Sequence, residues 1–172
     1  MVEILSLIIA LISLLTSIIV AVFVYRQARQ TNMLPIVTDM FREFRSGEFK
    51  QHQIYVYNEL AQDCNAEETG FSKLPKTSAD HVYPVSHFFD TLGFFVARGV
   101  VDKEIVIGFL GGAIESTWTA LEPFIRQERQ FRTLGYQQEM VPYQEHFEHL
   151  VSLARTHPQM RVIQRMKLRK LI

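Results

Sequence analysis

The chain has 172 residues, of which 48% are hydrophobic, and its 18 basic and 18 acidic side chains leave no formal net charge. This balance excludes a nucleic-acid-binding protein that relies on overall positive charge, and the hydrophobic fraction excludes a disordered chain. Cys64 is the single cysteine, which excludes an intramolecular disulfide and a zinc site built from several cysteines.

Residues 4–25 form an apolar run without charge, proline or glycine. A helix of this length is about 33 Å long and can cross a hydrocarbon core of about 30 Å. The start of the chain has neither a basic segment nor a small-residue cleavage site, so we expect an uncleaved transmembrane helix rather than a signal peptide. Because Arg26 and Arg29 follow the run, the positive-inside rule predicts an inner-membrane protein with its amino terminus outside and its carboxyl-terminal domain in the cytoplasm.

The small side chains of this run share one helix face, within an arc of about 80° at 100° per residue. Small residues let two helices approach closely, and serine hydroxyls can bond across the contact. We therefore predict that the span self-associates into a homo-oligomer, and the alternative is a chance alignment of small residues. The predicted self-association residues are Ser6, Ala10, Ser13, Ser17 and Ala21.

The first helix is expected to continue to Pro35, which then kinks it or starts a new helix. Ser46 is predicted to cap a second helix. Residues 62–78 contain turn-forming residues and are expected to form a long loop. An aromatic-rich helix follows, with Gly99 at its carboxyl end.

The second half of the domain predicts three further helices. Asp102 is expected to cap the first of these, and Gly111 and Gly112 to end it. The next helix is expected to bend or break at Pro123, and the last one follows a loop over 133–142. The fold class is therefore all-α, with one amino-terminal transmembrane helix followed by a cytoplasmic bundle of about five or six short helices. Three parts are predicted: a membrane anchor with its juxtamembrane helix (1–30), a helical domain (31–156) and a basic tail (157–172).

The tail differs in charge from the part of the chain before it. Residues 26–154 contain 12 basic and 17 acidic residues, whereas the tail contains five basic residues and no acidic one. One interpretation is contact with an anionic membrane surface. Docking on an acidic protein surface, a frayed terminus and phosphate binding stay open as alternatives, although nucleic acid is not an expected partner. The candidate contact residues are Arg161, Arg165, Lys167, Arg169 and Lys170.

No motif predicts a catalytic, cofactor-binding or metal-binding residue. His146 and His149 share one helix face but lack distant ligands with matching spacing. Cys64 has acidic neighbours in the sequence and no basic one beside it, which disfavours a nucleophilic thiolate. Neither a phosphate-binding glycine loop nor a nucleophile elbow is present. No cofactor is therefore predicted, and an enzyme is the less favoured interpretation.

Three segments together carry a family resemblance. They are Phe41–Phe49, Phe88–Asp102 and Trp118–Arg129, with their aromatic, glycine and Leu-Glu-Pro-Phe-Ile positions. Over about residues 20–156 the chain resembles an uncharacterised bacterial family of single-span membrane proteins with a small all-helical cytoplasmic domain, catalogued as a domain of unknown function. The resemblance implies the anchor and the helical fold, and it implies no activity.

These patterns together predict a membrane-anchored helical interaction or scaffold module that self-associates. Its expected partners are the lipid bilayer, further copies of itself and an unknown cytoplasmic protein. One alternative is a membrane-perturbing effector or sensor in bacterial stress or phage defence. Another is an enzyme whose site lies unrecognised at the aromatic helix.

Overall fold

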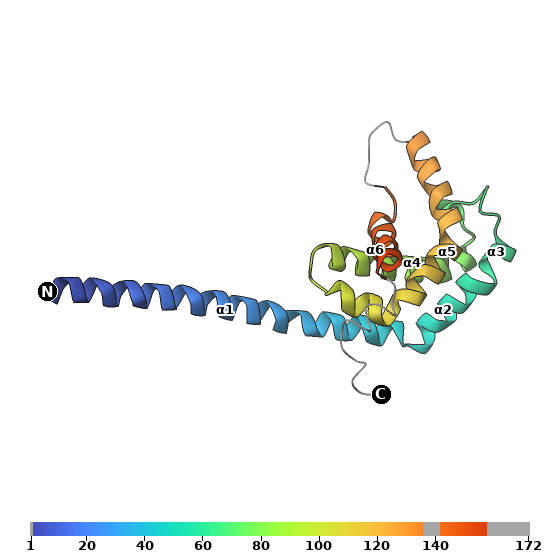
Figure 1. Ribbon diagram of the computed structural model, residues 1–172. Coiled ribbons are helices and arrows are strands. Elements are labelled where there is room, and N and C mark those ends of the chain that lie inside the picture. Colours follow the sequence, from blue (N-terminus) through green and yellow to red (C-terminus); the bar gives the residue numbers. More distant parts are fainter. Residues whose placement is uncertain (1, 136–141, 158–172) are drawn as a thin grey trace. The chain divides into compact units, whose positions relative to one another are not determined.

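A computed structural model describes residues 2–135 and 142–157, and every element in these ranges is helical. Figure 1 shows the order of the helices, and the all-α class is thereby confirmed for the described ranges. Contacts divide the chain into a unit of residues 1–42 and a unit from Glu43 onward, and each is described by itself. The basic tail from residue 158 and most of the predicted 133–142 loop lie outside the described residues.

Helix α1 (Val2–Phe44) is one continuous element that includes Pro35. The prediction of a new helix at Pro35 is therefore wrong. A proline removes one backbone N–H and displaces one carbonyl, while the hydrogen bonds before and after it can still continue the helix. A search over the described residues finds no helix with both the length and the apolarity of a membrane span.

Two short helices follow, α2 (Gly47–Asn58) and α3 (Leu60–Asp63). Ser46 caps α2 as predicted, since its hydroxyl accepts the N–H of Phe49 at 3.1 Å. A hydroxyl at this position satisfies one of the amide groups that the first helical turn leaves without a partner.

The predicted 62–78 loop is shorter than expected. It contains the 3₁₀ turn η1 (Phe71–Lys73), and helix α4 (Lys76–Ala97) begins before its predicted end. Phe71 is fully buried and Tyr83 donates a hydrogen bond to its carbonyl at 3.1 Å, so this connection is packed against the domain. A buried aromatic side chain thus gives order to a segment whose composition predicts only turns.

Helix α5 (Lys103–Gly135) is a single element of 33 residues. The predicted end at Gly111–Gly112 is therefore wrong, and of the two outcomes expected at Pro123, a bend or a break, the break is wrong. Glycine costs a helix interior about 1 kcal/mol each, and a proline about 3 kcal/mol. The buried side chains on both sides of these positions outweigh those costs, since each fully buried aliphatic or aromatic residue contributes about 1.5–3 kcal/mol. The buried residues are Ile107, Leu110, Ile114, Leu121, Phe124 and Ile125.

Helix α6 (Glu145–Thr156) packs against α4 and α5, as Figure 1 shows. Its Phe147 ring stacks on Phe89 of α4 at 5.2 Å and meets Trp118 of α5 edge-on at 5.1 Å. All three aromatic side chains are buried, and Trp118 is thus a core residue. Between α4 and α5, Gly99 has a φ of 64° and the Asp102 carboxylate accepts the Glu104 N–H at 2.7 Å, so both predicted caps are confirmed.

Candidate functional site

The most connected polar cluster lies where α2, α3 and α4 meet. Tyr55 Oη lies 2.9 Å from Asp63 Oδ2 and 2.8 Å from Ser78 Oγ, and Cys64 Sγ lies 3.5 Å from that same Ser78 oxygen. A phenol has one proton, so one arrangement satisfies all three contacts: the thiol donates to Ser78, Ser78 to Tyr55, and Tyr55 to Asp63. Burial raises the pKa of Tyr55, the hydrogen bond from Ser78 opposes this rise, and the bond to Asp63 adds to it. The cluster therefore holds the phenol in its protonated form.

Cys64 is 7% exposed and sits at the buried end of this hydrogen-bond chain. Its contact is a hydroxyl rather than a basic side chain, so the arrangement does not resemble an activated thiolate. Its role in the described structure is to pack and to bond across the α3–α4 junction.

Two histidines lie beside this chain. The Nδ1 atoms of His52 in α2 and His81 in α4 are 3.0 Å apart. The ring of Tyr55 stacks on His81 with centroids 4.6 Å apart and an interplanar angle of 22°. Both imidazoles are half-buried, so solvent reaches part of each ring.

We expect Tyr55→Phe to lower the free energy of unfolding by about 1–3 kcal/mol, because it leaves the buried Ser78 hydroxyl without its acceptor. Chemical denaturation of the full-length chain, followed by circular dichroism, measures this loss. Tyr25→Phe removes an exposed hydroxyl and is the matched control, with an expected change within about 0.5 kcal/mol. Equal midpoints for the two variants would contradict the proton arrangement described above.

A second polar cluster joins η1 to α5. Glu128 is 2% exposed, and its carboxylate accepts the Ser72 backbone N–H, the Ser72 hydroxyl and Arg132 Nε, each at 2.8 Å. Burial raises the pKa of Glu128, but these hydrogen bonds and the Arg132 charge outweigh burial and leave the pKa below its usual value. A Cβ at Gly70 would lie 2.8 Å from the same carboxylate, so glycine is required for this close approach. The ionised carboxylate is fully satisfied and fastens the turn to the helix.

Arg129, Tyr143 and Gln144 connect α5 to the start of α6. Arg129 donates to the Tyr143 carbonyl and to the Glu148 carboxylate, each at 2.8 Å. Burial raises the pKa of Tyr143 to about 12, and the nearby Gln144 side chain opposes this rise without reaching hydrogen-bond geometry. Gln144 is 5% exposed and has a left-handed backbone, with φ 60° and ψ 37°.

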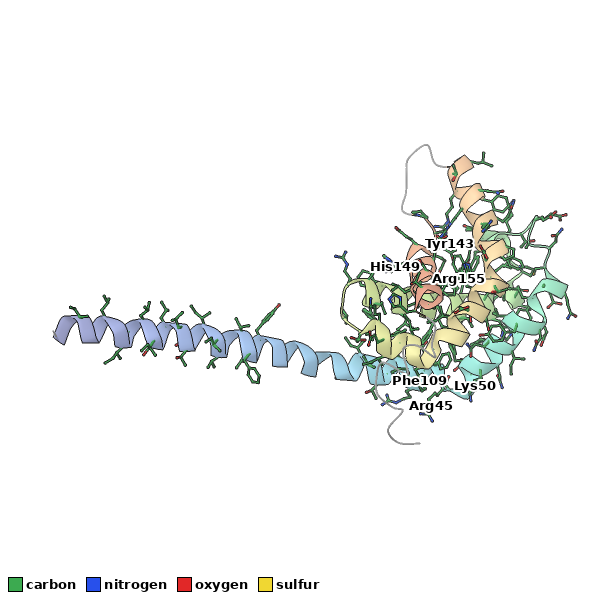
Figure 2. The ribbon with its side chains drawn as sticks, in the orientation of Figure 1. Arg45, Lys50, Phe109, Tyr143, His149 and Arg155 are labelled. Carbon is green, nitrogen blue, oxygen red and sulfur yellow. The ribbon has the colours of Figure 1, made fainter. Side chains whose placement is uncertain are left out.

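Three buried polar atoms in this connection between α5 and α6 lack a hydrogen-bond partner among the described residues: Arg129 Nη2, Tyr143 Oη and Gln144 Oε1. Tyr143 and Gln144 follow shortly after residues 136–141, which lie outside the described part of the chain. We therefore assign no ligand to them. Figure 2 labels Tyr143 at this position.

The predicted self-association residues all lie on α1 and are exposed there. The Ser17 hydroxyl donates to the Ser13 carbonyl at 2.8 Å, and the neighbouring Thr16 hydroxyl bonds to the Ile12 carbonyl at 2.9 Å. Their protons are thus satisfied within the helix, which is how hydroxyl side chains are accommodated in an apolar setting. The five predicted basic contact residues of the tail lie outside the described residues.

The histidines considered in the sequence do not converge with other ligands. His146 packs its ring on Phe94 at 5.3 Å, and His149 is exposed (Figure 2). Asp90 accepts the Phe147 N–H at 3.0 Å and therefore caps the first turn of α6. Over the described residues, no group of three or more His, Cys, Asp or Glu side chains has the geometry to hold a metal ion.

Sequence reasoning missed the His52–His81 pair and the buried Glu128. The two histidines are 29 positions apart, and Ser72 and Glu128 are 56 apart. One signal was available for Glu128, since Arg132 follows it four positions later on a predicted helix. No local pattern marks the histidine pair, because the two residues lie on different helices.

Comparison with known families places the chain. The profile of a domain of unknown function, DUF4760, matches residues 4–156. The chain belongs to this family. The DUF4760 match includes the apolar residues 4–25 and begins earlier than the resemblance at about residue 20 predicted, because that resemblance rested on motifs of the helical domain. The tail after residue 156 lies outside the match. No similar curated protein and no similar solved structure was found.

Proposed function

We propose that this DUF4760 protein is a membrane-anchored helical interaction module whose span brings copies of the chain together. Residues 4–25 are the anchor, and the helical domain faces the cytoplasm. The observation that carries the proposal is that residues 4–25 lie within one helix and that the apolar side chains described there are exposed.

The described apolar side chains of this segment are 48–71% exposed, from Val22 to Leu7. Figure 2 shows them projecting from both sides of α1 in that view. A helix that is hydrophobic on all sides requires an apolar environment, either the interior of a large protein or a bilayer. The segment is 22 residues long without a charge, which matches the thickness of a hydrocarbon core. We therefore assign the lipid bilayer as the environment of this segment.

The orientation follows from charge on the two sides of the segment. Glu3 is the one charged residue before it, whereas Arg26 and Arg29 follow it directly. Basic residues are retained on the cytoplasmic side during insertion. The helical domain after residue 42 would then meet its protein partners in the cytoplasm.

Self-association is proposed through the small-residue face of the anchor. Ser13, Ser17 and Ala21 follow one another at intervals of four residues, as in helix pairs whose backbones approach closely. Two tethered copies present two adjacent domain surfaces, which raises the effective concentration for a partner that contacts both.

Replacing Ser13, Ser17 and Ala21 together by leucine is expected to weaken self-association at least tenfold, equivalent to about 1.4 kcal/mol. A transmembrane reporter assay in bacterial inner membranes measures the association. Ile12→Phe, Leu15→Phe and Ile19→Phe together enlarge the opposite face and are the matched control. An undiminished signal in the leucine variant, at equal membrane expression, would reject this face.

A further inference from the structure

His52 and His81 have the arrangement of two ligands for one metal ion. We propose that they chelate a divalent first-row transition ion such as Zn²⁺, Ni²⁺ or Cu²⁺ through their Nδ1 atoms. This inference goes beyond the proposed interaction role and does not depend on it. Imidazole nitrogen suits these ions, whereas Mg²⁺ and Ca²⁺ prefer oxygen ligands.

The separation of the two nitrogens fits a shared ion. Imidazole nitrogen binds Zn²⁺ at about 2.0–2.1 Å. Two such nitrogens at a ligand angle of about 90–110° lie about 2.8–3.4 Å apart, as follows from that bond length. The observed Nδ1–Nδ1 distance is 3.0 Å, so little rearrangement is needed for both lone pairs to reach one ion.

The position of His81 is supported by the aromatic ring that stacks on it. Tyr55 is buried, and its hydroxyl is held by Asp63 and Ser78 at 2.9 and 2.8 Å. The stacked ring restricts how the imidazole can turn, as the supporting contacts around metal ligands do. His52 and His81 come from α2 and α4, two helices that pack together, so the pair is preorganised by the fold.

The coordination shell is expected to be completed by water or by an external ligand. No third His, Cys, Asp or Glu side chain converges on the pair within the described ranges. Both imidazoles are half-exposed, so solvent can reach the ion. A site with two protein ligands leaves coordination positions open, so the ion can exchange with solvent or bind a further ligand. A structural site, by contrast, has all four positions filled by protein side chains.

In the metal-free form the two Nδ1 atoms share one proton, since one nitrogen must donate and the other accept. On metal binding, the ring that carries its proton on Nδ1 takes the other neutral tautomer, with the proton on Nε2, so that both Nδ1 atoms are available as ligands.

The test uses the purified full-length chain without a histidine tag, in detergent micelles. Isothermal titration with NiCl₂ and ZnCl₂ at pH 7.5 is expected to give one ion per chain. His52→Gln and His81→Gln should each weaken binding about 100-fold, because loss of a ligand costs at least as much as loss of a supporting contact. His149→Gln removes an exposed histidine and should leave the affinity unchanged.

Electron paramagnetic resonance of the Cu²⁺-loaded wild-type chain tests the ligands without relying on a variant. Hyperfine structure from two imidazole nitrogens is expected. The proposal is overturned if wild-type protein shows no saturable binding up to millimolar metal. It is equally overturned if stoichiometric binding survives in the folded His52→Gln/His81→Gln double variant, since the ion would then lie elsewhere.

Discussion

Gly93→Ala is expected to destabilise the domain by about 3 kcal/mol or more. Gly93 lies in the middle of α4, where a Cβ would overlap the backbone carbonyl of His146 and lie 3.2 Å from the Phe147 nitrogen. These are main-chain atoms at the start of α6, so they cannot rotate away as a side chain can. The two helices would have to separate, which would open the Phe89–Phe147 stack.

Thermal or urea denaturation of the full-length chain measures this effect, and Gly47→Ala is its matched control. Gly47 opens α2, and a Cβ there would meet no atom within 4 Å. Alanine at this position should raise stability by about 0.5–1 kcal/mol, because glycine loses more backbone freedom on entering a helix. Similar midpoints for the two alanine variants would contradict the close packing of α4 against α6.

Ile12→Arg and Leu15→Arg together should release the protein from the membrane. Both positions lie near the centre of the apolar segment, on the face opposite the small residues. Each arginine at a helix centre costs about 2.5–3.5 kcal/mol of insertion free energy, and the pair about twice that. The measurement is the fraction of full-length protein that stays in the membrane pellet after an alkaline carbonate wash.

The matched control for this double variant is Thr38→Arg with Gln51→Arg, which adds the same charge at exposed positions of α1 and α2. It should leave the protein in the pellet. Recovery of the wild-type chain in the carbonate supernatant would contradict the anchor itself. Such a result would leave the metal proposal intact, because that test reports on a different part of the chain.

The structural features that could be predicted from the sequence are those that depend on neighbouring residues. Ser46, Gly99 and Asp102 act on neighbouring backbone groups, so their capping roles follow from residue type and position alone. The prediction that the helix ends at Gly111–Gly112 or breaks at Pro123 was wrong, because it considered local helix propensity and not the burial of side chains in the core. Burial of Leu110, Ile114 and Leu121 holds α5 together across both positions.

The polar clusters could not be predicted, since each depends on partners far apart in the chain. Tyr55 reaches Ser78 across 23 positions, and His52 reaches His81 across 29. The sequence also offered His146 and His149 as the more conspicuous pair, because regular spacing on one helix is visible without a structure. In the fold, His146 packs against an aromatic ring and His149 is exposed to solvent. The side chains that meet are instead His52 and His81, which lie on different helices.

The approach of α4 to α6 also bears on which substitutions the protein can accumulate over evolution. The contact made at position 93 is with the main chain of residue 146, which every amino acid possesses. Substitution of His146 leaves its main chain against position 93, whereas substitution of Gly93 places a Cβ where that main chain lies. Position 146 of α6 should therefore accept many different residues, whereas position 93 of α4 should remain glycine.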